Sequence, residues 1–124
     1  MSKIQVSAKI KIPRGKIIEF KEAAADYINQ VKEKDTRTLQ ADWFLSSDGT
    51  ECEIREAYED SEAVLKHQSN LPDLIMTIFG KFGTPYEVTI YGNPSTEVLE
   101  SARAGGLDVK LFSLLTGLQT IQTM

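Results

Sequence analysis

The sequence of 124 residues predicts a single α+β domain in which strands and helices follow one another in the order β-α-β-β-α-β. Four segments alternate apolar and polar residues, which is typical of strands with one buried face. Two longer segments repeat apolar residues every three or four positions, as amphipathic helices do. Two crossovers of this kind build a four-stranded antiparallel sheet with both helices on one face, so we expect a ferredoxin-like fold.

The first strand and helix have the clearest patterns. Residues 3–12 alternate strictly, and Pro13 ends the segment. From residue 17 to 31 apolar side chains recur at helical spacing until the charged run Lys-Glu-Lys-Asp at 32–35, which predicts a helix of about five turns. The apolar positions of this helix are Ile17, Phe20, Ala24, Tyr27, Ile28 and Val31. Its charged face is interpreted as a solvated surface.

The second and third strands are predicted at residues 38–46 and 50–58, joined through Asp48-Gly49. Both turn residues tolerate the positive backbone angles of a tight hairpin, so these strands should be antiparallel neighbours. Trp43 and Phe44 are adjacent in the second strand and must face opposite sides of the sheet. The helices can cover only one of them, and we therefore expect a second subunit to cover the other face as a homodimer.

A second helical region is predicted at residues 60–82 and a fourth strand at 85–91. Pro72 interrupts the helical pattern and should split or kink it, and Gly83 should end it. We assign residues 1–93 to the ferredoxin-like domain and residues 94–124 to an extension that packs on the same domain or on the dimer partner. The extension should contain a helix capped by Ser95 or Thr96, and residues 109–115 should form a short buried strand or a segment that lies across the neighbouring subunit.

Composition excludes several classes of function. Eighteen acidic and fourteen basic residues give a net charge of -4, which does not favour nucleic acid as a partner. No apolar run approaches the roughly 20 residues of a membrane span, and the first residues lack the apolar core of a secretion signal, so no membrane association and a cytoplasmic location are expected. The single cysteine, Cys52, excludes an internal disulfide and any multi-cysteine metal site.

One region brings several reactive side chains together. The third strand ends in Glu56 and Tyr58, and the following helix carries His67, the only histidine. Because the unperturbed pKa of histidine is near neutrality, His67 is the best candidate base, and Glu56 could orient its ring or hold its proton. The alternative is structural: His67 hydrogen-bonds to Glu56 or to a backbone carbonyl and fixes the helix to the sheet. Both interpretations stay open.

Three residues are candidates for binding a substrate. Tyr58 could donate a hydrogen bond to a substrate oxygen, although tyrosines at strand ends usually serve packing. Trp43 could stack on an aromatic ligand or could fill the core. Asp42 is a weaker candidate for a second acid or base, and it faces the opposite side of the sheet from Trp43, so at most one of the two can share a pocket.

The motif Glu-x-Tyr followed by Asp-x-x-Ala-x-x-x-His resembles the antibiotic biosynthesis monooxygenase family of dimeric α+β barrels. Its residues here are Glu56, Tyr58, Asp60, Ala63 and His67, and the resemblance covers about residues 3–93. It implies a homodimer whose pocket holds a small aromatic, quinone-like or enolic compound, oxidised by oxygen without metal or flavin. The protein would then supply a base, His67 with Glu56, and a dry pocket.

Fold carries over more safely than chemistry between relatives of this kind. The family's outline is also similar to lactone isomerases and to stress-response proteins. A non-catalytic dimer that binds a small apolar ligand or has a regulatory role is therefore the second hypothesis. Some proteins of this outline degrade haem, and the resemblance implies that they use an asparagine in the first strand. The first strand here carries Gln5, Ser7 and Lys9 instead, so haem degradation is disfavoured.

Overall fold

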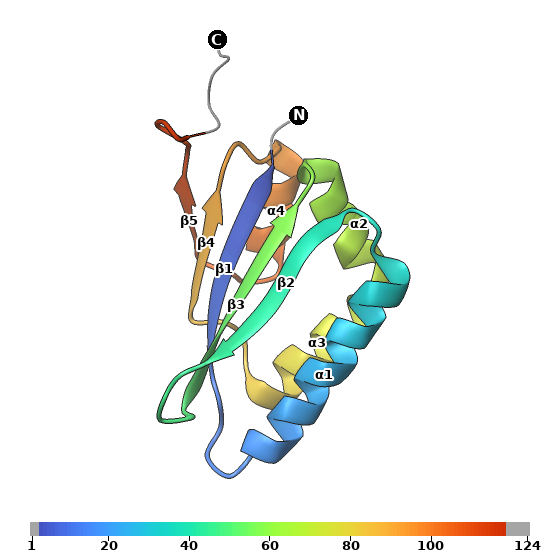
Figure 1. Ribbon diagram of the computed structural model, residues 1–124, viewed down its shortest axis with the longest axis vertical. Helices are drawn as coiled ribbons and strands as arrows, with labels where there is room; N and C mark the ends of the chain where they lie inside the picture. Colours follow the sequence, from blue (N-terminus) through green and yellow to red (C-terminus); the bar gives the residue numbers. More distant parts are fainter. Residues whose placement is uncertain (1–2, 119–124) are drawn as a thin grey trace.

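A computed structural model describes residues 3–118. The elements are β1 (Ile4–Lys11), α1 (Ile17–Lys34), β2 (Thr38–Leu45), β3 (Glu51–Tyr58), α2 (Ser61–Asn70), α3 (Pro72–Phe82), β4 (Glu87–Tyr91), α4 (Thr96–Ala104) and β5 (Val109–Phe112). The strands form one sheet in the order β2-β3-β1-β4-β5 (Figure 1). The first four strands pair antiparallel, which confirms the predicted ferredoxin-like α+β fold, and β5 is parallel to β4.

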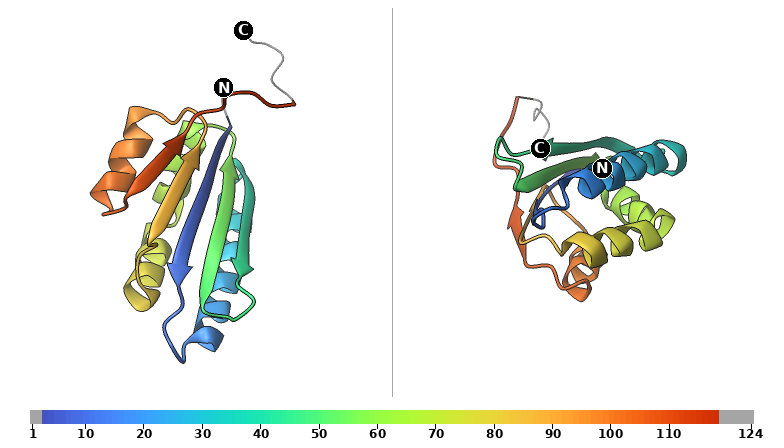
Figure 2. Two further views of the ribbon diagram at one scale, coloured as in Figure 1. Left: turned by 90° about the vertical axis from the view of Figure 1, so that its left-hand side faces the viewer. Right: turned by 90° about the horizontal axis from the view of Figure 1, so that it is seen from below.

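The helices lie on one face of the sheet, and the other face is uncovered (Figure 2). Strand β1 is central, with β3 and β4 as its neighbours, and its alternation places Ile4 and Ile10 in the core at 0% and 1% exposure. Trp43 faces the helices and packs against Phe20 and Tyr27 of α1, with ring centroids 5.6 and 5.2 Å apart. Its neighbour Phe44 is 52% exposed on the uncovered face, as the alternation of the strand requires.

The predicted turns and breaks are confirmed. Gly49 has a φ of 73° in the turn between β2 and β3. Pro72 divides the second helical region into α2 and α3, and Pro72 itself occupies the first turn of α3, where its missing N–H costs little. Gly83 ends α3. Within residues 3–118, no helix combines the length and the apolar character needed to cross a membrane.

The C-terminal extension belongs to the same sheet and core. Helix α4 buries Val98 and Ala102, and Val98 joins the apolar cluster of Ile4, Tyr58 and Ile90. Strand β5 extends the sheet at the β4 edge, so the predicted helix and strand are both present. Strand β5 covers Val109–Phe112 of the apolar run predicted at 109–115, and within the single chain it is an edge strand whose side chains are mostly exposed. Burial of this run against a neighbouring subunit stays a prediction. Phe112 is 53% exposed and Leu115 is 95% exposed. Residues 119–124 lie outside the described part of the chain.

Candidate functional site

An apolar cavity of about 180 Å³ lies between the sheet and the helices. Its sheet side is formed by alternate residues of four strands: Val6, Ala8, Trp43, Ile54, Glu56, Tyr58, Val88 and Ile90. Side chains of α1, α2, α3 and α4 close the other side, including Tyr27, Val64, His67, Ile78 and Val98. The cavity therefore separates two apolar clusters of the core, one around Phe20 and Phe82 and the other around Ile4 and Tyr58.

Glu56 is the carboxylate of this cavity, and two tyrosines hold it. The hydroxyl of Tyr27 donates to Oε2 of Glu56 at 2.6 Å, and the hydroxyl of Tyr58 donates to Oε1 at 2.5 Å. Glu56 and Tyr58 point to the same face of β3 because they are two residues apart. Tyr27 reaches the same point from α1. The hydrogen bonds offset the cost of placing a carboxylate in an apolar environment.

His67 is joined to this group through Tyr27. Its Nε2 lies 2.6 Å from the hydroxyl of Tyr27, and its Nδ1 contacts Oδ2 of Asp35. His67 is only 4% exposed, and the side chain of Asp35 is only 2% exposed. Both ring nitrogens therefore have protein partners, and Tyr27 rather than Glu56 is the direct neighbour of His67.

Local structure places His67 and Asp35 opposite each other. The side chain of Asp60 caps α2 by accepting from the backbone N–H of Ala63 at 2.9 Å, which sets the helix phase and turns His67 inward. Asp35 ends α1, where Asn70 of α2 donates to its Oδ1 at 2.6 Å. Asp35 thereby joins the end of the first helix to the second helix.

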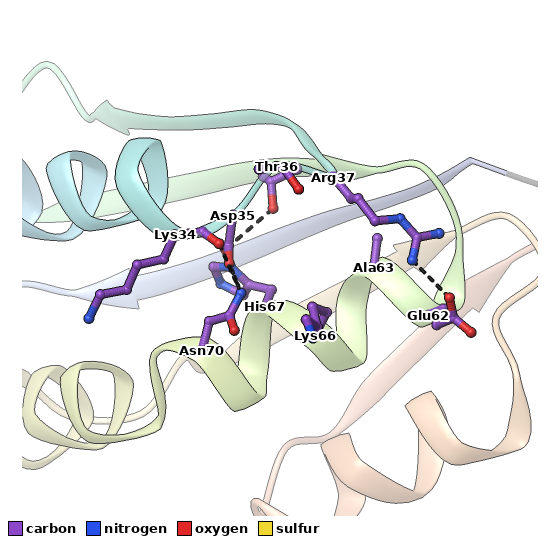
Figure 3. A pocket seen from close by; sticks show the side chains of 10 residues that line it. Lys34, Asp35, Thr36, Arg37, Glu62, Ala63, Lys66, His67 and Asn70 are labelled. Atoms are coloured by element: carbon purple, nitrogen blue, oxygen red, sulfur yellow. Dashed lines mark hydrogen bonds and ion pairs between the residues drawn. The ribbon is translucent and has the colours of Figure 1, made fainter.

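His67 also lines a second, polar cleft on the outside of the domain (Figure 3). This outer cleft has a volume of about 280 Å³ and lies where the end of α1 meets α2. Its other lining residues include Lys34, Asp35, Lys66 and Asn70. Among residues 3–118, His67 is the one residue that lines both the outer cleft and the apolar cavity.

Burial keeps the phenols of this group neutral. Burial and the nearby Glu56 carboxylate raise the pKa of Tyr27 well above its ordinary value, and the same two causes raise the pKa of Tyr58. Both tyrosines are therefore hydrogen-bond donors and acceptors at neutral pH, and not phenolates. Burial also raises the pKa of the Cys52 thiol to about 11, which keeps it protonated and a poor nucleophile.

Trp43 lines the cavity and has a buried indole N–H without a hydrogen-bond partner among the described residues. A buried donor of this kind costs free energy unless something accepts from it. The sequence left open whether Trp43 binds a ligand or fills the core. In the structure it borders both the core cluster and the cavity.

The structure brings together four of the five candidate site residues: Glu56, Tyr58, Trp43 and His67. It separates Asp42 from them, because Asp42 follows the opposite side-chain direction on β2 and is exposed beside Gln40. Sequence reasoning missed Tyr27, which was interpreted as part of an apolar helix face, and Asp35, which was assigned to a charged helix end. A carboxylate at the C-terminal end of a helix is electrostatically unfavourable, and this was the available signal for Asp35.

No family model and no curated protein matches the sequence. Solved structures do match it. The protein MupZ from Pseudomonas fluorescens is 19% identical, with a TM-score of 0.75 over 94% of this chain and 93% of MupZ. A putative antibiotic biosynthesis monooxygenase from Caulobacter crescentus CB15 is 22% identical, with a TM-score of 0.59 over 72% of this chain and 85% of that protein. The chain has the antibiotic biosynthesis monooxygenase fold.

A third protein of this fold, from Nitrosomonas europaea and named a putative antibiotic biosynthesis monooxygenase, is 20% identical, with a TM-score of 0.58 over 74% of this chain and 89% of that protein. The alignment with MupZ covers more of this chain than the other two do, 94% against 72% and 74%. At these identities the comparison establishes the fold of the monooxygenase family, and the residues of the cavity must carry any argument about chemistry.

Proposed function

We propose that the chain binds a small cyclic or enolic compound in the apolar cavity and removes a proton from it, as a cofactor-independent monooxygenase. The observation that carries this proposal is the carboxylate of Glu56, which lines an apolar cavity and is coupled through Tyr27 to the only histidine. A carboxylate placed beside a bound ligand can remove a proton from it as a general base.

The volume of the cavity limits the substrate. Cavities of about 150 Å³ hold a benzene ring, so a cavity of about 180 Å³ suits a compound with one ring or a short enol. The unpartnered indole N–H of Trp43 calls for a hydrogen-bond acceptor, such as a carbonyl oxygen, on the ligand. We infer a monocyclic phenol or enol with a second oxygen, and not a polycyclic quinone.

Glu56 acts as the base and His67 as its proton partner in this mechanism. Loss of the proton makes the substrate electron-rich, and the anion passes an electron to oxygen. Recombination of the two radicals forms a carbon–oxygen bond, the stored proton converts the peroxide anion to a hydroperoxide, and loss of water leaves a carbonyl group. A CH₂ group and O₂ thus become C=O and H₂O, and the protein supplies proton transfer and exclusion of water.

Binding of para-nitrophenol tests the site. Because Trp43 is the only tryptophan and lines the cavity, binding is expected to quench its fluorescence. Proton transfer to Glu56 should give the absorbance band of the phenolate at a pH where the free compound is mainly protonated. The variant Glu56→Gln should keep the quenching and lose the band, and Glu53→Gln, on the other face of β3, is the matched control and should keep both.

The same variants separate the two functional hypotheses. In an oxygen-uptake screen of monocyclic phenols and enols, Glu56→Gln should lower any turnover about 10²–10⁴-fold, the usual contribution of a general base. Quenching without a phenolate band and without oxygen uptake in the wild type would support the non-catalytic ligand-binding protein instead. In that case His67 has the structural role, held by Asp35 and Tyr27.

We also infer that a second copy of the chain covers the open face of the sheet. Phe44 and Phe112 are 52% and 53% exposed there, and Phe112 stacks on Tyr91 with ring centroids 5.8 Å apart. The same face carries Lys9 and Glu87, which pair with each other within the chain at 3.5 Å and leave no unpaired charge between them. Sedimentation equilibrium should give a dimer for the wild type and a shift towards monomer for Phe44→Asp, whereas a monomeric wild type would reject the inference.

A further inference from the structure

We propose that Tyr27 and Asp35 join His67 and Glu56 in a hydrogen-bonded chain that shares one mobile proton and sets whether Glu56 is a base or an acid. The inference rests on the proposed function for its chemical purpose, since it names the residues that control the base. Neither Tyr27 nor Asp35 belongs to the motif Glu-x-Tyr…Asp-x-x-Ala-x-x-x-His. Both are positioning residues that act through their neighbours.

The geometry fixes the number of protons in the chain. Tyr27 has one hydroxyl proton but lies 2.6 Å from two groups, Oε2 of Glu56 and Nε2 of His67. When Tyr27 donates to Glu56, Nε2 must carry a hydrogen and donate to Tyr27. When Tyr27 donates to Nε2, Glu56 must be protonated and donate to Tyr27. Without one of these hydrogens, two lone pairs would face each other at hydrogen-bond distance.

Asp35 is the hydrogen-bond partner of the other ring nitrogen of His67, Nδ1. As a carboxylate, Asp35 accepts from the Nδ1–H of His67 and from Asn70, and it stabilises a positive charge on the ring. The chain then has two forms with the same number of protons. In one, His67 is an imidazolium between the carboxylates of Asp35 and Glu56. In the other, His67 is neutral and Glu56 is a carboxylic acid.

Conversion between the two forms is a proton transfer within the chain. The Nε2–H bond of His67 breaks and its proton goes to the oxygen of Tyr27, while the O–H bond of Tyr27 breaks and its proton goes to Oε2 of Glu56. No oxidant or other reactant is needed. Because Tyr27 gives one proton as it receives another, its phenolate is not formed.

This chain spans the wall between the apolar cavity and the outer cleft. Glu56 lines the cavity, and Asp35 and His67 line the cleft, which also carries the charged side chains of Lys34 and Lys66. Asp35 is the member of the chain through which protons can be exchanged with water in the cleft. The chain thus gives Glu56 a proton route to the outer cleft, in addition to its own partly exposed side.

The sole histidine makes a direct test possible by ¹⁵N NMR of the ligand-free protein at neutral pH. Every imidazole signal belongs to His67. Glu56→Gln removes the carboxylate at the far end of the hydrogen-bonded chain and should change His67 from an imidazolium to a neutral ring. In the spectrum, one of the two N–H signals should disappear, and the nitrogen that lost its hydrogen should shift far downfield. Glu53→Gln, three positions away on the other face of β3, should leave the signals unchanged.

A double-mutant cycle shows whether Tyr27 carries the coupling. Tyr27→Phe removes the hydroxyl between the two groups, so in its background Glu56→Gln should no longer alter the His67 signals. Far-UV circular dichroism and thermal unfolding confirm that each variant is folded. His67 signals that Glu56→Gln leaves unchanged, or an undiminished effect of Glu56→Gln in the Tyr27→Phe background, would overturn the inference. Because no ligand is present, this test can fail while para-nitrophenol still binds as phenolate, and the reverse also holds.

Discussion

Replacing Asp35 with alanine is expected to lower the free energy of unfolding by about 3–5 kcal/mol, the usual cost of removing one partner of a buried ion pair. The side chain of Asp35 is only 2% exposed and contacts His67, which is 4% exposed. The substitution leaves the Nδ1–H of His67 without its acceptor, and the amide of Asn70 keeps only its hydrogen bond to the backbone oxygen of Lys34. It also removes both contacts of the Asp35 side chain with α2, the helix that carries His67 and Asn70. Urea unfolding followed by circular dichroism measures the loss.

Two further variants show where that loss originates. Asp26→Ala removes an exposed carboxylate from the same helix and should change the stability by less than about 0.5 kcal/mol, as most surface substitutions do. Asp35→Asn keeps an acceptor for Nδ1 and should cost less than Asp35→Ala, but its uncharged side chain no longer stabilises an imidazolium. Equal stability of Asp35→Ala and the wild type would show that the contact with His67 is not formed in solution.

The order of elements was predictable because it depends on patterns within single segments. Alternation in β1, the Asp48-Gly49 turn and the break at Pro72 each act over a few residues. The environment of β5 was not predictable in this way. An apolar run predicts burial only if another layer covers it, and β5 lies at the sheet edge with Phe112 half exposed.

The difference between patterns within one segment and contacts between distant segments also explains which site residues the sequence predicted and which it did not. Glu56 and Tyr58 share a strand face, and the capped helix that follows brings His67 back over the same strand, so their convergence follows from local structure. Tyr27 is 29 residues from Glu56, and Asp35 is 32 residues from His67. Their contacts depend on where α1 crosses the sheet and where it ends against α2, which no pattern within one segment encodes.

Alkaline solution is expected to destabilise the protein steeply above about pH 10, the ordinary pKa of tyrosine. Burial raises the pKa values of Tyr27 and Tyr58 in the folded protein, so the unfolded chain loses these protons first. The stability from this difference is fully present below about pH 10 and is lost as the pH rises towards the folded pKa values. Each tyrosine should contribute a slope of about 1.4 kcal/mol per pH unit, and the pair about 2.7.

Single variants show how much each tyrosine contributes to this slope of stability against pH, which urea unfolding at a series of pH values measures. Tyr27→Phe and Tyr58→Phe should each remove about half of it, whatever their effect on stability at neutral pH. Tyr86 is the matched control: its hydrogen bond to Glu51 raises its pKa to about 12, but it is exposed and water screens the interaction, so Tyr86→Phe should change the slope much less. Burial raises the thiol pKa of Cys52 to about 11, so Cys52 adds a separate loss of stability at alkaline pH. This loss begins one pH unit or more below the loss caused by the tyrosines, and Cys52→Ala should remove it. An unchanged slope in Tyr27→Phe would mean that its hydroxyl is hydrated in the folded protein, which would open the hydrogen-bonded chain between Glu56 and His67 to water.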